Sequence, residues 1–583
     1  MASTGPSTSP LTAHVRYVRG SDAITLKFPL LGVERQLVRQ PTEELSRILV
    51  RIDRLLHPPM TKQQFKQGKK TKLKQVHEAL GKATTTIELR DRDGAPLSPT
   101  LPLGDVLPRA MTLQIQDDVY AIVLNEPALL ALSVTEFDLV VGVPIVPTVE
   151  LEFCTQTECQ WMWTRVSSTS ERTVVGAAFV YTPTSDDVGC RLEVNCIAPT
   201  GASLATTTTG NVVPTPDRSA FAARLAHPAP DTDDASAFRI MSYNILYAKY
   251  ARADRAYNRM YPYAQPGILF DKYRLPLIAL EMLETRADLI CAQEMGHGVF
   301  HSYFLPLLRA HGFDGHYAGK AGTTPEGCAV LYNTAKWQLV EATVVGFADA
   351  LKDIESTSPL QHFLSAHPQV ALAVGTVPSV AQVLLLRQVH GAGIVLVANT
   401  HLFFRHDADA VRLVQTVLMT RFLEQKKADI EARDGVPVSV VITGDLNALP
   451  DAIPAQFLLR GAVGSDHRHW QEAAAFQWSA EEGSTPTPWP DTMPETLAHD
   501  LSLGSACGSP EFTHFVKNHE FTFIGTLDHI LVDTETLTPT SHLPFFSLDV
   551  AGHEKSLPSS VFPSDHISLV ADVRFHTSPS TLK

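Results

Sequence analysis

From residue 238 to the C-terminal region, short apolar runs alternate with stretches of helical periodicity, and this alternation constrains the fold more than any other feature. Val440–Thr443 is one such run, in which four β-branched residues predict a buried strand that Gly444 ends. LPLIALEMLETR, residues 275–286, is one of the helical stretches. Strands that alternate with helices predict an α/β domain, here over residues 238–577.

The chain before this domain has a different pattern. A hairpin, a helical pattern and further strands follow one another in an order that resembles a β-grasp module. Short strands with Pro and Thr between them, one of them rich in Trp, then resemble an immunoglobulin-like β-sandwich. The predicted order is a disordered N-terminus (1–13), the β-grasp-like module (14–125), the immunoglobulin-like sandwich (126–213), a Pro-, Ala- and Asp-rich linker (214–237), the α/β domain (238–577) and a tail (578–583).

Composition excludes several classes of protein. The formal net charge of −14 argues against broad, non-specific binding of duplex DNA. No run of about 18 apolar residues occurs, so we expect no membrane span. Seven cysteines without a CxxC pair disfavour a zinc site and favour free thiols in a reducing compartment. The lysine-rich segment 61–75 is interpreted as a solvated loop, with RNA contact as the alternative.

Polar side chains recur where the strands of the α/β domain end. Each alone is typical of a turn or a cap. Together they predict a site, because loops at the mouth of a rigid sheet are where sites are usually built. They are Asn244, Gln293, Glu294, Asn399, His401, Asp445, Asn447, Asp528, Asp565 and His566.

The chemistry of phosphodiester cleavage requires this kind of set. A divalent cation neutralises the non-bridging oxygens and the departing oxyanion, and Mg²⁺ prefers oxygen ligands. A water must also be deprotonated and held in line with the phosphorus. The sequence contains no Ser-His-Asp array, no GxGxxG pattern and no Walker pattern that would indicate another reaction.

The segments SYNIL, LICAQE, GCAVLY, ANTHL, GDLN and PSDH, with the polar residues in this order, resemble the endonuclease/exonuclease/phosphatase family. Within it, the chain is similar to the deadenylase branch, and most of all to mitochondrial 2′,5′-phosphodiesterases that degrade 2′,5′-oligoadenylate and trim poly(A). YPYAQPGILFDKYRLPLI, CGSPEFTHFV and TPTSDDVGCRLEVNC carry this likeness over nearly the whole chain. The resemblance implies a four-layer α/β sandwich, in which two packed mixed sheets are flanked by helices.

The resemblance also implies the ligands of a metal ion. Glu294 is expected to be the principal ligand of Mg²⁺, for which Mn²⁺ is a possible substitute. Asn244 and Asp565 would support it. Asp445 would polarise or deprotonate the attacking water, with a second metal as an alternative route, and Asn447 would hold the scissile phosphate beside the metal.

Further roles follow from the same resemblance. His401 would contact the phosphoryl oxygens. His566 would act on phosphate or water, with Asp528 fixing its tautomer. Phe523 lies where relatives stack the terminal adenine, and its alternative interpretation is a core aromatic.

The chain departs from the family pattern at several positions near the expected base-binding mouth. They are Phe404, Arg405 and His406 after the THL segment, His514, and His529. These departures leave the expected catalytic residues intact and leave adenine preference open. Our hypothesis is that Arg405 adds a contact to phosphate or base.

The sequence therefore predicts a Mg²⁺-dependent 3′-exoribonuclease that degrades oligo- and poly(A), including 2′,5′-oligoadenylate, and releases 5′-AMP. The alternatives are a nucleotide phosphatase and a catalytically inert RNA-binding scaffold. Single-stranded RNA is the expected partner, with no membrane and no obligate protein partner. The resemblance implies the mitochondrial matrix. The first twenty residues lack acidic side chains, as mitochondrial presequences do, but HVRYV (14–18) already alternates like a strand, so the cytoplasm is the alternative.

Overall fold

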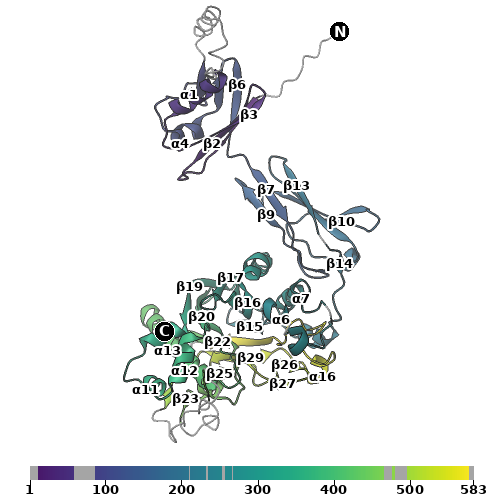
Figure 1. The fold of residues 1–583 in the computed structure, drawn as a ribbon, viewed down its shortest axis with the longest axis vertical. Helices are drawn as coiled ribbons and strands as arrows, with labels where there is room; N and C mark the ends of the chain where they lie inside the picture. The colour runs from purple at the N-terminus through teal and green to yellow at the C-terminus, as the bar shows by residue number, and fades with distance from the viewer. Residues whose placement is uncertain are drawn as a thin grey trace, which may run out of the picture. The chain divides into compact units, whose positions relative to one another are not determined.

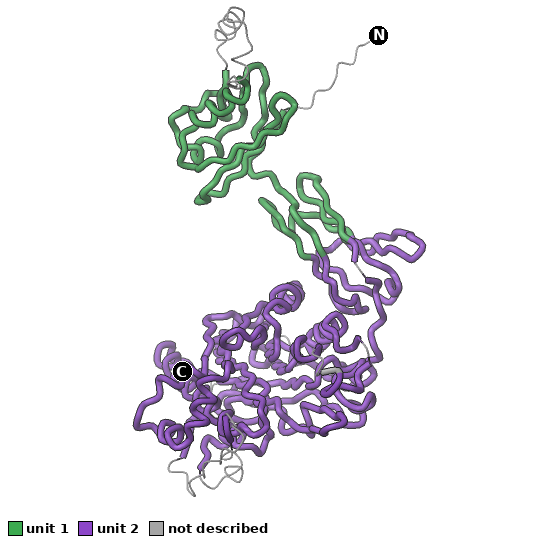
Figure 2. Tube along the Cα trace, in the orientation of Figure 1, with its two compact units in different colours: residues 1–133, 148–162, 194–206 green, residues 134–147, 163–193, 207–583 purple. Residues whose placement is uncertain are grey.

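The computed structural model describes residues 11–57, 86–208, 210–231, 234–252, 256–265, 267–464, 476–478 and 496–576. The chain forms two compact units (Figure 2). The first comprises Met1–Ser133, Thr148–Met162 and Val194–Thr206, and the second comprises Val134–Pro147, Trp163–Glu193 and Thr207–Lys583. The lysine-rich segment 61–75 and the tail 578–583 lie outside the described residues.

The first unit begins with a six-stranded sheet in the order β3-β2-β1-β6-β5-β4 (Figure 1). Its elements are β1 (Leu11–Arg16), β2 (Ile24–Leu30), β3 (Val33–Arg39), α1 (Leu45–Leu56), β4 (Ile87–Arg90), α4 (Leu103–Val106), β5 (Thr112–Ile115) and β6 (Asp118–Leu124). Helix α1 buries Leu45, Ile48 and Ile52. Strand β1 pairs antiparallel with β2 and parallel with β6. The predicted sequence of hairpin, helix and strands is present, and the β-grasp assignment stays a prediction.

The predicted disordered N-terminus, 1–13, is too long. Strand β1 starts at Leu11, and Ala13 is fully buried in the core of the first sheet. The residues ahead of β1 are polar, and the strand itself begins with the half-buried Leu11 and Thr12. The alternating pattern that predicts a strand is therefore weak at this start.

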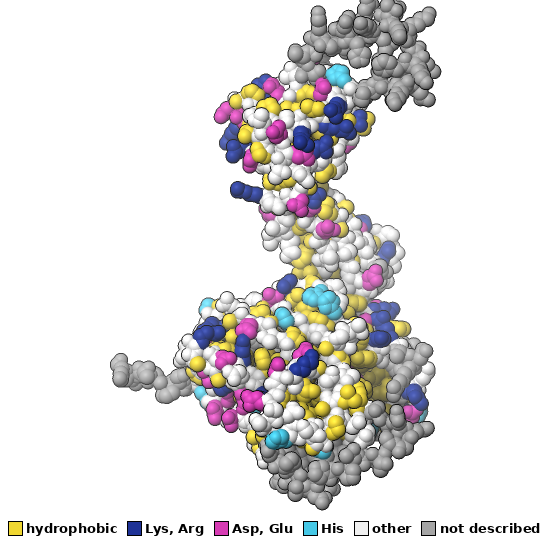
Figure 3. Space-filling model, turned by 60° about the vertical axis from the view of Figure 1, so that its left-hand side comes forward, with side chains coloured by type: hydrophobic (Ala, Val, Ile, Leu, Met, Phe, Trp, Pro, Cys, Tyr) yellow, Lys and Arg dark blue, Asp and Glu magenta, His cyan; other side chains and the backbone are white. Residues whose placement is uncertain are grey.

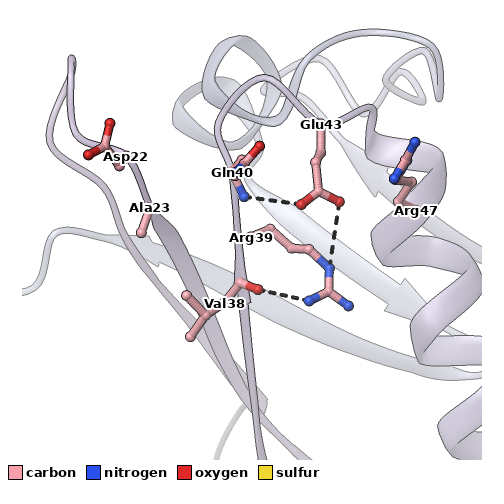
Figure 4. Close-up of a pocket in the computed structure, with 7 residues that line it drawn as sticks. All are labelled: Asp22, Ala23, Val38, Arg39, Gln40, Glu43 and Arg47. Carbon is pink, nitrogen blue, oxygen red and sulfur yellow. Dashed lines mark hydrogen bonds and ion pairs between the residues drawn. The ribbon is translucent and has the colours of Figure 1, made fainter.

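A pocket of about 380 Å³ lies beside β2, β3 and α1 and is drawn in Figure 4. Its lining residues bind one another: Arg39 Nη1 donates to the Val38 carbonyl (2.8 Å), and the Gln40 backbone amide donates to Glu43 Oε1 (3.2 Å). None of the strand-end residues of the α/β domain is among the residues that line it: Asp22, Ala23, Val38, Arg39, Gln40, Glu43 and Arg47. This pocket is therefore separate from the predicted site.

Short strands fill the region from residue 126 to residue 213, as predicted. They are β7 (Ala128–Ser133), β8 (Leu139–Val140), β9 (Thr148–Glu152), β10 (Gln160–Val166), β11 (Arg172–Gly176), β12 (Arg191–Ile197), β13 (Ser203–Thr207) and β14 (Val212–Val213). Trp163 is fully buried and stacks on Tyr181, with ring centroids 5.6 Å apart. All seven cysteines are free thiols. The immunoglobulin-like assignment stays a prediction.

The linker predicted over 214–237 is wrong in its central part. Residues Ser219–Phe221 and Ala222–Ala226 form the short helices η3 and α5. Phe221 is only 2% exposed within a cluster of aromatic side chains, and Arg224 Nη2 donates to Ser568 Oγ at 2.7 Å. The Pro- and Ala-rich composition predicted a linker, but two anchoring side chains pack this segment onto the α/β domain.

The α/β domain contains two six-stranded sheets, in the orders β17-β18-β16-β15-β30-β29 and β19-β20-β21-β22-β28-β25. The first consists of β15 (Ala237–Asn244), β16 (Leu289–Gly296), β17 (Phe313–Gly319), β18 (Glu326–Asn333), β29 (Leu537–His542) and β30 (Leu569–Phe575). The second consists of β19 (Trp337–Gly346), β20 (Val380–Gln388), β21 (Ile394–His401), β22 (Ser439–Asp445), β25 (Leu503–Ser505) and β28 (Asp528–Asp533). Each contains one parallel pair, β15–β16 or β21–β22, among antiparallel ones. The predicted α/β domain with mixed sheets is confirmed.

The hydrophobic clusters define the layers of this domain. Ile240 and Val330 of the first sheet share a buried cluster with Val397 and Val441 of the second, so the two sheets pack face to face. Helix α7 (Asp271–Glu284) packs on the outer face of the first sheet. Helices α11 (Pro359–Ala366), α12 (Pro368–Thr376), α13 (Asp409–Asp434) and α14 (Ile453–Arg460) pack on the outer face of the second. The order is helix, sheet, sheet, helix.

Two expectations from the composition concern membrane spans and surface charge. None of the helices within the described residues combines the length and the apolar character that a membrane crossing needs. On the face drawn in Figure 3, Lys and Arg side chains are mixed with Asp and Glu. The described part of that face carries no broad positive surface, in keeping with the net charge of −14.

Candidate active site

The strand-end residues converge because of the strand directions. The ends of the parallel strands β15 and β16 lie at one edge of the first sheet, and those of β21 and β22 lie at one edge of the second. Asn244 ends β15, while His401 and Asp445 are register partners at the ends of β21 and β22. Asp528 begins the antiparallel strand β28 directly opposite Asp445. Packing of the two sheets brings both edges together.

Glu294 owes its orientation to a bulge in β16. The pairing of β16 with β18 shifts register between Ala292 and Met295, and Glu294 has a φ of 56°. Such bulges re-aim a side chain, and here the carboxylate points to the centre. The preceding Gln293 turns inward, where its Nε2 donates to Asn399 Oδ1 at 2.8 Å. Gln293 and Asn399 therefore join the two sheets and do not join the site.

Asn244 links the acidic groups of the two sheets. Its Nδ2 donates to Glu294 Oε1 at 3.2 Å and to Asp445 Oδ2 at 3.0 Å. Glu294 Oε2 also accepts the Tyr247 amide at 2.7 Å. Burial, and then the neighbouring carboxylates of Asp565 and Glu326, raise the pKa of Glu294 to about 7. Crowded, buried carboxylates of this kind are stabilised by a cation.

His566 is held between two acids. Its Nδ1 lies 2.7 Å from Asp528 Oδ2, and its Nε2 lies 3.7 Å from Asp445 Oδ2. Burial opposes protonation, but the charges on Asp528 and Asp445 raise the pKa of His566 well above its ordinary value. Asp528 thus favours the tautomer or cation that carries a proton on Nδ1.

His401 stands on the other side of Asp445. Its Nε2 lies 3.6 Å from Asp445 Oδ2, and its Nδ1 lies 3.3 Å from Lys320 Nζ. Burial, followed by the charges on Lys320 and His566, lowers the pKa of His401 well below its ordinary value. The His401 ring is therefore neutral, whereas the His566 ring is charged.

Asn447 follows Asp445 in a left-handed conformation, with a φ of 48°. Its amide donates to Asp445 Oδ1 at 2.8 Å, and its Nδ2 donates to the Leu402 carbonyl at 3.0 Å. The GDLN segment is therefore a tight turn, as its composition predicted, and the turn places two polar side chains at the centre.

The structure adds Tyr261, which the sequence reasoning missed, and places His514 at the centre, where only a position near the base-binding mouth was expected. Tyr261, 3% exposed, donates its hydroxyl to Asp565 Oδ2 at 2.7 Å. His514 Nε2 lies 3.3 Å from the same oxygen, and its ring stacks on His566 with centroids 4.4 Å apart. Burial favours the neutral acid, but His514, His566 and Tyr261 together hold the pKa of Asp565 below its usual range. The family-like segment that begins at Tyr261 was a signal for the tyrosine.

Lys320 was also missed. It lies directly after β17 and pairs with the fully buried Glu326 at 2.5 Å, next to His401. No local pattern marks a single lysine after a strand, because an isolated Lys is usually solvated.

The residues of the predicted base-binding mouth are dispersed. Phe523 is half-buried on the hairpin of β26 (His514–Lys517) and β27 (Thr522–Gly525), with its ring 5.4 Å from that of His514. Phe404 is 74% exposed. The Arg405 guanidinium pairs with Asp407 at 2.6 Å and lies over Phe476.

The other two departures have different surroundings. His529 is buried, and its Nε2 lies 3.0 Å from the Ala448 carbonyl oxygen. His406 is exposed, and its carbonyl accepts from Arg412 at 3.4 Å.

Within the described residues, the donor set fits a divalent cation. Asp445, Asp528 and His566 have ligand atoms within 4.8 Å of one another, as do His514, Asp565 and His566. The buried Asp528 Oδ1 has no hydrogen-bond partner in the described chain. Carboxylate and amide oxygens predominate around Glu294, which favours a hard cation over a thiophilic one.

A buried set of carboxylates, amides and imidazoles at the joined edge of two packed sheets defines a metal-assisted hydrolase of phosphate esters. The chain belongs to the Endonuclease/Exonuclease/phosphatase family, whose model matches residues 241–566. It is a hydrolytic enzyme.

Several known proteins are similar to the chain. The 2′,5′-phosphodiesterase 12 of Rattus norvegicus is 28% identical and covers 97% of this chain and 94% of its own length. The Homo sapiens 2′,5′-phosphodiesterase 12 has the same identity and coverage. The Mycosarcoma maydis CCR4-Not complex 3′-5′-exoribonuclease subunit Ccr4 is 26% identical over 58% of this chain and 50% of its own length. The solved structure of ANGEL2, a 2′,3′-cyclic phosphatase, is 22% identical over 58% of this chain and 96% of that chain, with a TM-score of 0.47.

Proposed function

We propose that the protein is a Mg²⁺-dependent 3′-exoribonuclease that degrades oligo- and polyadenylate, 2′,5′-linked chains included, and releases 5′-AMP. The observation that carries the proposal is the position of Asp445. Its Oδ2 accepts from Asn244 and lies within 3.7 Å of both His401 Nε2 and His566 Nε2. The similarity to 2′,5′-phosphodiesterase 12 over nearly the whole chain supports the substrate class.

In this proposal Glu294, Asn244 and Asp565 would hold the metal ion, with support from Asp445 and Asn447. Mg²⁺, or Mn²⁺ in its place, supplies neutralisation of the non-bridging phosphate oxygens and of the leaving oxyanion. The Tyr247 amide on Glu294 and the Tyr261 hydroxyl on Asp565 keep these two carboxylates in place.

Asp445 accepts the proton of the attacking water. Burial raises the pKa of its carboxyl, which makes it a better base than an exposed aspartate. His566, charged because of Asp528, donates a hydrogen bond to the phosphoryl group, and neutral His401 contacts it from the opposite side. Both act in a site from which water is largely excluded, where such bonds stabilise the developing charge most.

Different residues bind the scissile phosphate and the terminal base of the substrate. Asn447 holds the scissile phosphate, and Phe523 stacks the terminal base, a contact worth roughly 1–3 kcal/mol. Arg405 adds a phosphate or base contact when it leaves Asp407. If Arg405→Ala leaves KM for oligonucleotides unchanged, this last contact is absent.

The decisive experiment is incubation of the full chain with 2′,5′- and 3′,5′-linked A, C and U oligomers, with and without Mg²⁺. We expect Mg²⁺-dependent release of 5′-AMP. Inorganic phosphate from a nucleotide such as NADP, without AMP from oligomers, would identify a nucleotide phosphatase. If Glu294→Gln hydrolysed the oligomers as fast as the wild type, the activity would come from a contaminant, and the chain would be an inert scaffold. Asp349→Asn is the matched control for the loss of one carboxylate, because the wild-type Asp349 carboxylate is 82% exposed and its loss should leave turnover unchanged.

The compartment is part of the same proposal. We propose the mitochondrial matrix because the chain resembles mitochondrial 2′,5′-phosphodiesterases, with the cytoplasm as the alternative. Protection of the tagged full chain from protease in intact mitochondria is the expected result, and recovery in the cytoplasmic fraction would favour the alternative. The β-grasp-like and immunoglobulin-like assignments of the front modules belong to the proposal as well.

A further inference from the structure

A group of rings lies beyond the metal-binding centre, on the β16–β18–β17 side of the first sheet. Tyr247 follows β15, and Tyr250 lies in α6 (Ala248–Arg252). His297 begins α8 (His297–Val299), His301 lies in the π-helix η5 (Phe300–Phe304), and Tyr317 lies in β17. We call these five side chains the aromatic rim. The mechanism above uses none of these rings.

The rings of the rim contact one another and remain accessible. His297 lies 4.6 Å from His301 and 5.2 Å from Tyr317 between ring centroids, and Tyr247 lies 5.3 Å from Tyr250. Tyr250 is 47% exposed, and both histidines are exposed. A Cβ on Gly296 would meet the Tyr247 ring at 3.2 Å, so the glycine lets this ring lie beside the start of α8. The rim therefore consists of two groups of rings, Tyr247 with Tyr250 and His297 with His301 and Tyr317, which meet at Gly296.

The rim is directly connected to the catalytic centre. The Tyr247 amide donates to Glu294 Oε2 at 2.7 Å. The Tyr250 hydroxyl donates to Glu326 Oε1 at 3.3 Å, and Glu326 pairs with Lys320, the neighbour of His401. A molecule that reaches from the scissile phosphate over Glu294 would therefore meet Tyr247 first.

The chemistry of the rim suits nucleic-acid bases. The phenol rings of Tyr247 and Tyr250 are neutral at physiological pH. Partial desolvation of its ring, followed by His297 and Arg309, lowers the pKa of the exposed His301, so this imidazole is neutral as well. Lys249, exposed and next to Tyr250 in the sequence, offers a cation for a phosphate. Neutral rings interleaved with a cation are typical of surfaces that bind single strands.

Strand order gives the direction of the bound chain. Strand β26 lies beside the chain that leads into β30, because His514 pairs with His566 in an isolated bridge. Phe523, on the same hairpin, is therefore on the β30 side of Asn244 and Glu294, whereas β18 and β17 are on the opposite side. A strand whose terminal base stacks on Phe523 continues across the centre toward the rim.

We propose that the aromatic rim binds the bases of the nucleotides upstream of the scissile phosphodiester by stacking. This inference rests on the proposed function and adds an upstream binding track of several nucleotides to it. Because every base presents a π-face, the track tolerates any base. The enzyme should therefore favour longer single strands over dinucleotides whatever their upstream sequence.

The test measures binding without turnover, by fluorescence anisotropy of the full chain in EDTA. The ligands are an adenylate dinucleotide, a hexamer, and a hexamer whose upstream positions are abasic. We expect the hexamer to bind on the order of tenfold more tightly than the dinucleotide, the gain from about one stacked base. The abasic hexamer should lose most of this advantage. Tyr250→Ala and His301→Ala should reduce it, whereas Tyr250→Phe, which keeps the ring, should retain it.

His553→Ala, an exposed histidine elsewhere on the α/β domain, is the matched control and should keep the wild-type ratio. The inference is overturned if the abasic hexamer binds as tightly as the adenylate hexamer, or if both Tyr250→Ala and His301→Ala keep the wild-type ratio. Failure of the proposed function is distinguishable, because it would appear as a lack of hydrolysis of every oligomer when Mg²⁺ is added.

Discussion

The two sheets of the α/β domain contribute different chemistry to one centre. The first sheet supplies Asn244 and Glu294, and Asp565 precedes its strand β30, so this side offers oxygen ligands for a cation. The second sheet supplies His401, Asp445 and Asp528, to which the proposed function assigns the handling of protons. The bond from Asn244 Nδ2 to Asp445 Oδ2 joins the two sides. Metal binding and proton transfer should therefore be separable by mutation.

The largest effect is expected from removing the base on the second sheet. Asp445→Asn keeps the shape but cannot accept the proton of water, so kcat should fall by about 10²–10⁴. Mg²⁺ binding, followed by calorimetry, should change much less. An equal loss of Mg²⁺ affinity and kcat would show that the two sides are not separate.

Glu294→Gln should give the opposite pattern on the first sheet. Removal of a residue that hydrogen-bonds to a metal ligand typically lowers metal affinity by roughly 10- to 100-fold. Removal of the ligand itself should lower the affinity at least as much. Activity should recover in part as Mg²⁺ is raised. Full activity at the wild-type Mg²⁺ concentration would remove Glu294 from the metal site.

Mg²⁺ binding should depend on pH in a defined direction. The pKa of Glu294 is raised to about 7, so below that pH a proton occupies the carboxylate and the metal must displace it. Affinity should fall as pH falls from 8 to 6, approaching about tenfold per unit below the pKa. Calorimetry at several pH values checks this, and Glu294→Gln should show a flatter profile.

The smallest effect is expected at the hydroxyl that holds Asp565. Tyr261→Phe removes the 2.7 Å hydrogen bond and should lower Mg²⁺ affinity by roughly tenfold. Tyr263→Phe is the matched control, because the Tyr263 hydroxyl donates to the Leu557 carbonyl and not to an acid. Identical Mg²⁺ titrations for both variants would show that Tyr261 only fills space.

Strong local patterns made much of the fold predictable. The β-branched run before Gly444 and the alternation of strands with helices gave the α/β domain, because both patterns depend on residues close in sequence. The linker over 214–237 was wrong, since Phe221 and Arg224 are stabilised by partners more than 300 residues away, such as Phe546 and Ser568. Tertiary packing overrode the local composition there.

The sequence by itself determined many of the strands that form and that polar groups stand at their ends, because β-propensity and turn chemistry are local. Only the tertiary structure decided which of these groups meet. It turned Gln293 and Asn399 inward and brought Tyr261, Lys320 and His514 to the centre. The physical reason is that contacts between sheets depend on packing over long sequence separations, which no short motif encodes.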